Sequence, residues 1–251
     1  MWASPVAPTT RVHVDLNNDQ EDAVRKAEAM MHLHDTYNEL DLRGIRALAV
    51  VGSAGTGKST VLVTIADQCN AKARRVALCS FTACVAYNYR GVCPCAHCDA
   101  VHGVTWYYDG ITVHEVAIRL LRYDTVIIDK IFMLPKISFD LVVAAWLDAE
   151  KYFLLNVGGD EGQLVPFNDD GQEDVGHYGT YYWRYFFTAR LALPARSDAH
   201  HCLLQERVRF GEMPRELTEG VWQEGTLDQV SVKNVRDLFT MYAATTQYTR
   251  A

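Results

Sequence analysis

Residues 50–60 read Val50-Val51-Gly52-Ser53-Ala54-Gly55-Thr56-Gly57-Lys58-Ser59-Thr60, which fits the pattern G-x-x-x-x-G-K-[ST]. The stretch follows a short apolar run, 47–51, that we expect to be a buried strand. It precedes an apolar segment, 61–66, that can continue as a helix. This strand–loop–helix context indicates a phosphate-binding loop rather than a glycine-rich turn with an incidental lysine. The sequence therefore predicts a nucleoside triphosphate site.

The residue types of this loop suit a triphosphate and its metal. Glycines let the backbone curl so that several N–H groups point at the phosphates, and the helix N-terminus adds a favourable dipole. Lys58 would reach the β- and γ-phosphates, and the Ser59 hydroxyl would bind Mg²⁺.

Composition sets the class of protein. With 251 residues, 49% of them apolar and 22% charged, the chain is long enough for one large domain or two small ones. We expect no membrane span and no secretory signal, because no apolar run approaches about 18 residues and residues 1–8 lack a charged and an apolar region. Seven cysteines, an odd number, indicate reduced thiols and an intracellular protein: nuclear or mitochondrial in a eukaryote, cytoplasmic in a bacterium. A net charge of −7 argues against a surface that binds nucleic acid everywhere, but not against a local groove.

Short apolar strands alternate with helical segments along the chain. We expect strands at 47–51, 76–81, 125–129, 152–157 and 187–192, and helices at about 16–36, 58–69, 82–89, 113–121, 137–149 and 198–208. This alternation predicts an α/β fold, a mostly parallel sheet with helices on both faces. We expect a flexible tail at 1–15, one domain at 16–218 with an acidic surface loop at 167–180, and an extension at 219–251.

Two further strands end in polar residues. The apolar strand 125–129 closes with Asp129, the acid that a P-loop enzyme needs opposite its loop to hold Mg²⁺ through Ser59 and water. Gln163 follows the strand at 152–157, on the edge where open α/β sheets build their ligand crevice. A glutamine there can sense the γ-phosphate or orient the attacking water.

The order of these segments resembles that of Pif/RecD-like DNA helicases of superfamily one. Residues 16–23 are similar to the adenine-reading segment of that family, and the elements that follow match motif I (52–59), motif Ia (80–86, with Gly91 and His97 or His102 after it), motif II (127–133) and motif III (159–166). Residues 193–198 and 208–211 resemble the elements that close the first motor domain. The match covers roughly residues 14–215 and implies one RecA-like P-loop NTPase domain, the first of two motor domains.

The resemblance implies roles for the matching residues. Gln20 would contact adenine, Gln163 would couple the γ-phosphate to DNA, and Arg196 would contact a phosphate. Thr82 and His102 would contact single-stranded DNA, whose backbone is held without sequence being read. The residues that would hold ATP and Mg²⁺ are Gly52, Gly55, Thr56, Gly57, Lys58, Ser59, Thr60 and Asp129. The implied activity is that of an ATP-dependent helicase moving 5′→3′ on single-stranded DNA in repair, recombination or telomere maintenance.

The sequence also departs from the family. Lys130 stands where the family has the glutamate that polarises the attacking water, and loss of a general base costs about 10²–10⁴-fold in rate. Phe81, Ala83 and Val165 replace a proline, a glycine and a proline. The chain ends where a second motor domain would begin. That domain would supply an arginine finger worth about 10³–10⁵ in rate. This chain would receive such a finger only from a second motor domain acting in trans.

Two other functions therefore stay open. Lys130 and the missing second domain favour a catalytically inactive module that binds nucleotide and single-stranded DNA. A P-loop enzyme of another kind, such as a nucleoside kinase, would need a base pocket and a lid arginine, but neither Gln20 nor the residues around Gln163. ATPase activity measured with and without single-stranded DNA distinguishes the three.

Other clusters have simpler interpretations. Cys93, Cys95, His97 and Cys98 could bind zinc, but their spacing fits no pair of C-x₂-C motifs, so we expect solvent-facing reduced thiols. The aromatic residues after motif Ia, Tyr87, Tyr89, Trp106, Tyr107 and Tyr108, could stack on bases or pack in the core. We expect the aromatic run 181–187 to be mainly core, and His200-His201 to be solvated.

Overall fold

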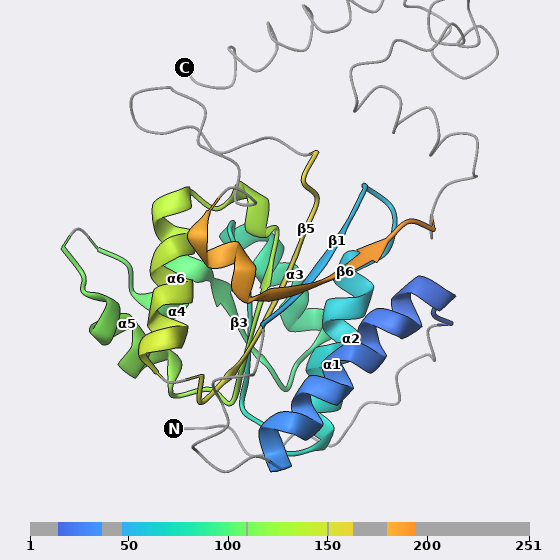
Figure 1. Cartoon of the computed structure of the whole chain (residues 1–251), viewed down its shortest axis with the longest axis horizontal. Coiled ribbons are helices and arrows are strands. Elements are labelled where there is room, and N and C mark those ends of the chain that lie inside the picture. The colour runs from blue at the N-terminus through green and yellow to red at the C-terminus, as the bar shows by residue number, and fades with distance from the viewer. Residues whose placement is uncertain (1–14, 37–46, 109, 150, 163–179, 194–251) are drawn as a thin grey trace, which may run out of the picture. The chain divides into compact units, whose positions relative to one another are not determined.

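The computed structural model describes residues 15–36, 47–108, 110–149, 151–162 and 180–193. Its centre is a six-stranded sheet in the order β3-β2-β4-β5-β1-β6 (Figure 1). The strands are β1 (Ala47–Gly52), β2 (Val76–Ser80), β3 (His97–Ala100), β4 (Thr125–Asp129), β5 (Leu154–Gly159) and β6 (Phe186–Leu191). Every neighbouring pair is parallel, so the carboxyl ends of all six strands lie along one edge.

Helices cover both faces of the sheet (Figure 1). They are α1 (Asn18–Thr36), α2 (Lys58–Ala71), α3 (Ala83–Val92), α4 (Val101–Thr105), α5 (Val113–Leu120) and α6 (Lys136–Asp148), with short 3₁₀ helices η2 (Ile131–Met133) and η4 (Tyr181–Tyr185). Side chains alternate across each strand: Leu48 and Val50 pack with α1 and α2, whereas Ala49 and Val51 join the core beneath α4, α5 and α6. Because both faces are buried, the inner strands are almost wholly apolar.

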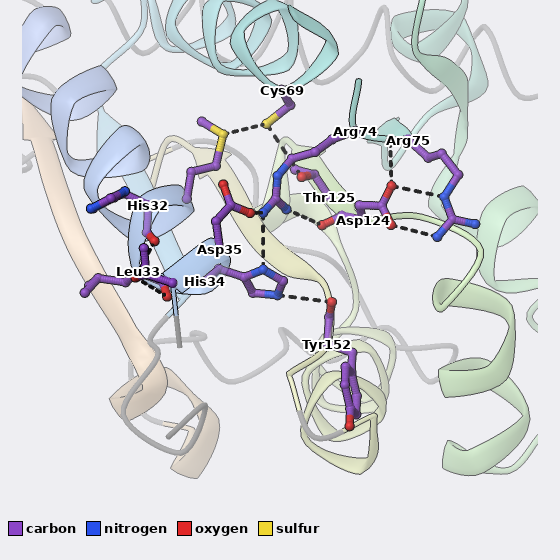
Figure 2. A network of polar contacts seen from close by, with 12 residues as sticks. His32, Leu33, His34, Asp35, Cys69, Arg74, Arg75, Asp124, Thr125 and Tyr152 are labelled. Carbon is purple, nitrogen blue, oxygen red and sulfur yellow. Dashed lines mark hydrogen bonds and ion pairs between the residues drawn. The ribbon is translucent and has the colours of Figure 1, made fainter. Parts of the chain in front are cut away.

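The edge at the amino ends of the strands carries a polar network that Figure 2 shows in detail. Arg75 makes a bidentate pair with Asp124, at 2.7 and 3.0 Å, and this hydrogen bonding holds the pKa of Asp124 below its usual range. Arg74 contacts Asp35 and His34 at the end of α1 and donates to the Asp124 carbonyl oxygen at 3.2 Å. The network ties α1 to the starts of β2 and β4.

The expected α/β architecture is confirmed, and all five expected strands are present with boundaries shifted by no more than about two residues. Strand β3 and helix α4 were not expected. Their sequence, His97 to Thr105, is mostly polar or small, so it carries no apolar run by which a strand could be recognised. The expected helix at 198–208 and extension at 219–251 lie outside the described residues, as do the expected tail at 1–15 and acidic loop at 167–180 apart from residues 15 and 180.

Strand β3 also corrects the expectation for the cysteines. Cys93 and Cys98 are buried, not solvent-facing, and only Cys95 of the three is exposed. Because β3 pairs with β2, the alternation of the strand turns Cys98 inward, where burial raises the pKa of its thiol to about 11. Among the described residues there is no group of three or more potential metal ligands.

The chain divides into two units, Met1–Arg196 and Ser197–Ala251, and every described residue belongs to the first. No helix within the described ranges combines the length and the apolar character needed to cross a bilayer.

Candidate nucleotide-binding site

The loop between β1 and α2 has the backbone that its sequence predicts. Gly55 and Gly57 both have φ of +82°, a left-handed conformation that glycine adopts without steric cost. Gly57 is the residue before α2, and no side chain caps the first turn of that helix. The N–H groups of Lys58, Ser59 and Thr60 therefore begin a helix whose amino end is open to an anion.

Lys58 folds back across this loop. Its Nζ donates to the carbonyl oxygens of Gly52 and Ser53, at 2.8 and 2.6 Å, and the residue is only 6% exposed. The Thr56 hydroxyl donates to the same Ser53 oxygen at 2.9 Å. These bonds hold the ammonium at the mouth of the loop, where it can meet the β- and γ-phosphates of a nucleotide.

Ser59 and Asp129 come together although they are far apart in the sequence. The Ser59 hydroxyl donates to Asp129 Oδ2 at 3.0 Å, and Asp129 is 1% exposed at the end of β4. Two more donors serve this carboxylate: the Tyr89 hydroxyl contacts Oδ2, and the Lys130 backbone N–H donates to Oδ1 at 2.8 Å. Burial and the neighbouring Asp129 raise the pKa of Tyr89, so the phenol keeps its proton and acts as the donor.

A buried hydroxyl lies next to this group. Ser80 ends β2 in register with Asp129, is fully buried, and has no hydrogen-bond partner for its Oγ among the described residues. Mg²⁺ prefers oxygen ligands and retains several of its waters, which need nearby hydrogen-bonding groups. Ser59, Asp129 and Ser80 therefore form an oxygen-rich set that fits a hydrated Mg²⁺ at the mouth of the loop.

Gln20 ties α1 to the loop. Its Nε2 donates to the Thr56 carbonyl oxygen at 2.9 Å, and the residue is 3% exposed. Asn17 and Gln20 exchange side-chain-to-backbone bonds of 3.0 Å each, which forms a capping box at the start of α1. The side chain implied to read adenine is thus fixed beside the phosphate loop.

The residues implied to contact DNA lie on the same edge of the sheet. Thr82 precedes α3 just beyond the end of β2, and His102 lies in α4 just beyond the end of β3. The rings of Phe81 and His102 meet edge-on with centroids 6.3 Å apart, and His102 meets Tyr107 in the same way at 5.5 Å. These contacts join the loops that follow β2 and β3 into one surface.

The aromatic residues after motif Ia divide between core and surface. Tyr89 is buried, whereas Tyr87, Trp106 and Tyr108 are exposed. The Arg119 guanidinium lies 4.9 Å from the centroid of the Trp106 ring and 5.8 Å from that of Tyr108, and Arg122 adds a second cation over Trp106 at 5.2 Å. We call Trp106, Tyr108, Arg119 and Arg122 the aromatic–arginine patch.

The run 181–187 is core only in part. Phe186 is buried and Tyr182, Trp183 and Tyr185 pack against the core, but Tyr181 and Phe187 are exposed. Phe187 is exposed although it shares its face of β6 with the buried Ala189 and Leu191, and the Lys26 ammonium lies 5.2 Å from the centroid of its ring. Gln163, Arg196 and the pair His200-His201 lie outside the described residues.

Lys130 follows Asp129 with φ of +60°, a conformation that non-glycine residues rarely adopt. It is the residue that immediately precedes the 3₁₀ helix η2. The lysine thus stands directly after Asp129, where the resemblance to Pif/RecD-like helicases leads us to expect a glutamate.

Tyr89 and Ser80 were not among the predicted site residues. Ser80 is the first residue of the segment that resembles motif Ia, so its place at the end of β2 was a usable signal. Tyr89 was expected to stack on bases or to pack in the core; no local pattern predicts its contact with Asp129, because that contact depends on how α3 packs against the sheet.

The fold and this arrangement of residues define a RecA-like P-loop domain. Residues 43–169 match the AAA domain family, and the chain belongs to that family.

Individual proteins similar to the chain belong to a narrower group, the Pif1 helicases. It is 32% identical over 133 residues to the ATP-dependent DNA helicase PIF1 of Trypanosoma brucei brucei, a match over 51% of this chain and 11% of that protein. The Pif1 helicase from Candida albicans matches 82% of this chain and 48% of its own with a TM-score of 0.60 and 18% identity. Bacteroides Pif1 in complex with ADP-AlF3 and ssDNA matches 93% and 57% with a TM-score of 0.57 and 14% identity.

These likenesses confirm the resemblance to the N-terminal motor domain of Pif1-like helicases. At identities below 20%, the two crystal structures show the shared fold. The chain spans about half the length of these solved relatives and about a tenth of the trypanosome protein.

Proposed function

We propose that this chain binds Mg²⁺–ATP and serves as the nucleotide-binding motor domain of a helicase that moves along single-stranded DNA. The observation that carries the proposal is the Ser59–Asp129 hydrogen bond at the mouth of the loop. It places the P-loop hydroxyl and the acid at the end of β4 around one position, as a phosphate-bound Mg²⁺ requires. Ser59 and Asp129 would hold the ion, which would offset the negative charge of the phosphates.

The chain's own residues would divide the work of binding. Lys58 would move from the carbonyl oxygens of its loop to the phosphates, and the N–H groups at the start of α2 would hold the same oxygens. Gln20 would orient the loop from the side of α1 through its bond to Thr56.

Single-stranded DNA is the proposed track. Thr82 and His102 lie on the edge of the sheet that carries the P-loop, and the aromatic–arginine patch joins the residues that follow α4 to the end of α5. Exposed aromatic rings stack on bases regardless of sequence, and arginines attract phosphates. Bacteroides Pif1, which shares this fold, has been crystallised in complex with single-stranded DNA. Movement in the 5′→3′ direction and roles in repair, recombination or telomere maintenance belong to the same proposal.

A second candidate is a domain that binds nucleotide and DNA without turnover. Lys130 favours it, because an ammonium beside the metal site attracts phosphates but cannot accept the proton of an attacking water.

The first proposal, the motor, requires an arginine finger as well. A second motor domain acting in trans would supply it.

ATP binding and hydrolysis, each measured with and without oligo-dT, test the proposal. ATP binding with hydrolysis that rises on adding DNA supports the motor. ATP and DNA binding with background hydrolysis supports the second candidate. Phosphoryl transfer to a nucleoside, indifferent to DNA, would contradict both.

A further inference from the structure

Protein donors already surround one oxygen of the metal-facing carboxylate. The hydroxyls of Tyr89 and Ser59 both donate to Asp129 Oδ2, and the Lys130 N–H donates to Oδ1. An ionised carboxylate has about four acceptor positions, two on each oxygen. Oδ2 therefore has no acceptor position left for a water molecule.

The two hydroxyls differ in what they can do when metal arrives. The Ser59 oxygen can bind Mg²⁺ while its hydroxyl still donates to Asp129, so this hydrogen bond is compatible with the metal. The Tyr89 hydroxyl reaches the same Oδ2 from α3. It takes an acceptor position that a water of the hydrated ion would otherwise use.

Tyr89 is also held firmly in this place. It is 7% exposed and packs in the core cluster that contains Val61, Leu62 and Leu78. A side chain packed in this way does not swing away without loosening its neighbours. Its hydroxyl therefore competes with incoming water instead of yielding to it.

We propose that Tyr89 competes with the waters of Mg²⁺ for Asp129, so that helix α3 sets the metal affinity of the nucleotide site. The proposal rests on the proposed function, because it takes the site to be one for Mg²⁺ and ATP. It assigns to Tyr89 a positioning role that acts through Asp129 rather than on the nucleotide.

The test is a titration of Mg²⁺ into the full chain with a fluorescent ATP analogue, started in EDTA, for the wild type and Tyr89→Phe. Phenylalanine keeps the ring in the core and removes only the hydroxyl. We expect the half-saturating Mg²⁺ concentration to fall about fivefold, the factor that one net hydrogen bond provides. Binding of the analogue in EDTA should stay the same.

Tyr123→Phe is the matched control. Tyr123 is a buried tyrosine just before the start of β4, and its hydroxyl contacts His97 at the opposite edge of the sheet from Asp129. Its removal should leave the Mg²⁺ requirement unchanged. Thermal melts followed by circular dichroism show that each variant is folded, and the equilibrium between Mg²⁺ and free nucleotide is common to all three proteins.

An equal or higher Mg²⁺ requirement in Tyr89→Phe, with the analogue still bound, would overturn the proposal and leave the proposed function standing. A higher requirement would mean that Tyr89 supports Asp129 as a metal-holding residue. Absence of nucleotide binding by the wild type at any Mg²⁺ concentration would overturn the proposed function, and this proposal with it.

Discussion

Ser59 at the start of α2 and Asp129 at the end of β4 are joined by a 3.0 Å hydrogen bond, although strand β5 lies between β4 and the strand that leads to α2. The parallel sheet makes this contact possible, because it brings the carboxyl ends of β1, β5 and β4 to one edge. The order and direction of the strands therefore bring the loop that carries Ser59 close to Asp129. Because the two segments are far apart in the sequence, each can be tested by its own substitutions.

Replacement of Lys58 by alanine should weaken ATP binding about tenfold or more. The lysine is the charged donor at the mouth of the loop, and a hydrogen bond to a charged group is worth about 1.5–3 kcal/mol. Titration with a fluorescent ATP analogue measures the change. Lys72→Ala, at the other end of α2, is the control and should bind as the wild type does. Unchanged ATP affinity in Lys58→Ala would contradict the assignment of a nucleotide site to this loop.

Replacement of Lys130 by glutamate should raise the ATPase rate only modestly. The change restores a general base beside Asp129, but the resemblance places the arginine finger on a second motor domain. Lys130→Gln removes the charge without supplying a base and should stay near background. Phosphate release with and without oligo-dT measures all three proteins. Robust DNA-stimulated turnover by the unmodified chain would show that the base is elsewhere, with Asp160 or Glu161 as the next candidate.

Trp106→Ala should weaken binding to oligo-dT, because the exposed indole can stack on a base and stacking is worth about 1–3 kcal/mol. Fluorescence anisotropy at low and moderate salt measures the affinity, which should be weak and fall with salt, given the net charge of −7. Tyr152→Ala is the control: the residue is 43% exposed, just before β5 begins, and it is not a member of the patch. An equal loss of oligo-dT affinity in both variants would contradict the assignment of the patch as a DNA-binding surface.

Gly52→Ala should destabilise the domain by about 1–3 kcal/mol, the usual cost of forcing an extra group into a packed site. A Cβ there would lie 2.5 Å from the Leu191 carbonyl oxygen and 2.8 Å from Thr56 Oγ1. Gly91→Ala in α3 is the matched control, since no atom of the described residues lies within 4 Å of the place its methyl group would take. That variant should gain about 0.5–1 kcal/mol of helix propensity. Urea unfolding measures both, and equal stabilities would contradict the close approach of β1 and β6.

The stability of the domain should fall as the pH drops below 6.5, the ordinary pKa of histidine, in part through His34. Burial, and then the positive charge of Arg74, lower the pKa of His34 in the folded chain. Its Nε2 faces the Tyr152 carbonyl oxygen at 3.1 Å, and its Nδ1 faces Arg74 Nη2 at 3.2 Å (Figure 2). The ring is therefore neutral, with its proton on Nε2, and Asp35 only partly offsets the arginine.

The direction of this pH effect on stability follows from proton uptake by the unfolded chain. Between pH 6.5 and the lowered pKa, the unfolded chain binds a proton that the folded chain does not, so the free energy of unfolding decreases with falling pH. His34→Gln should flatten this slope, whereas His32→Gln, exposed on the same helix, should keep it. Urea unfolding at a series of pH values provides the comparison. An identical slope in wild type and His34→Gln would contradict the assignment.

The sequence predicted the parts of the site that are encoded in short, continuous segments of the chain. The loop around Lys58 and the acid at Asp129 each follow an apolar strand, and a parallel sheet necessarily collects such strand ends on one edge. Tyr89 was not predicted because its role depends on the rotation of α3 about its axis, which follows from packing. Strand β3 was missed because its pairing with β2, rather than its own residues, makes it a strand.

The position of β1 in the sheet has a consequence for folding. Its two neighbours, β5 and β6, are made only when synthesis reaches residues 154–191, whereas β2, β3 and β4 form a continuous set of neighbours earlier in the chain. Contacts that close long loops form slowly, because the chain entropy is lost before the contact is made. We therefore expect the phosphate loop to form late in folding, and a nucleotide that needs it to bind the completed domain and not its precursors.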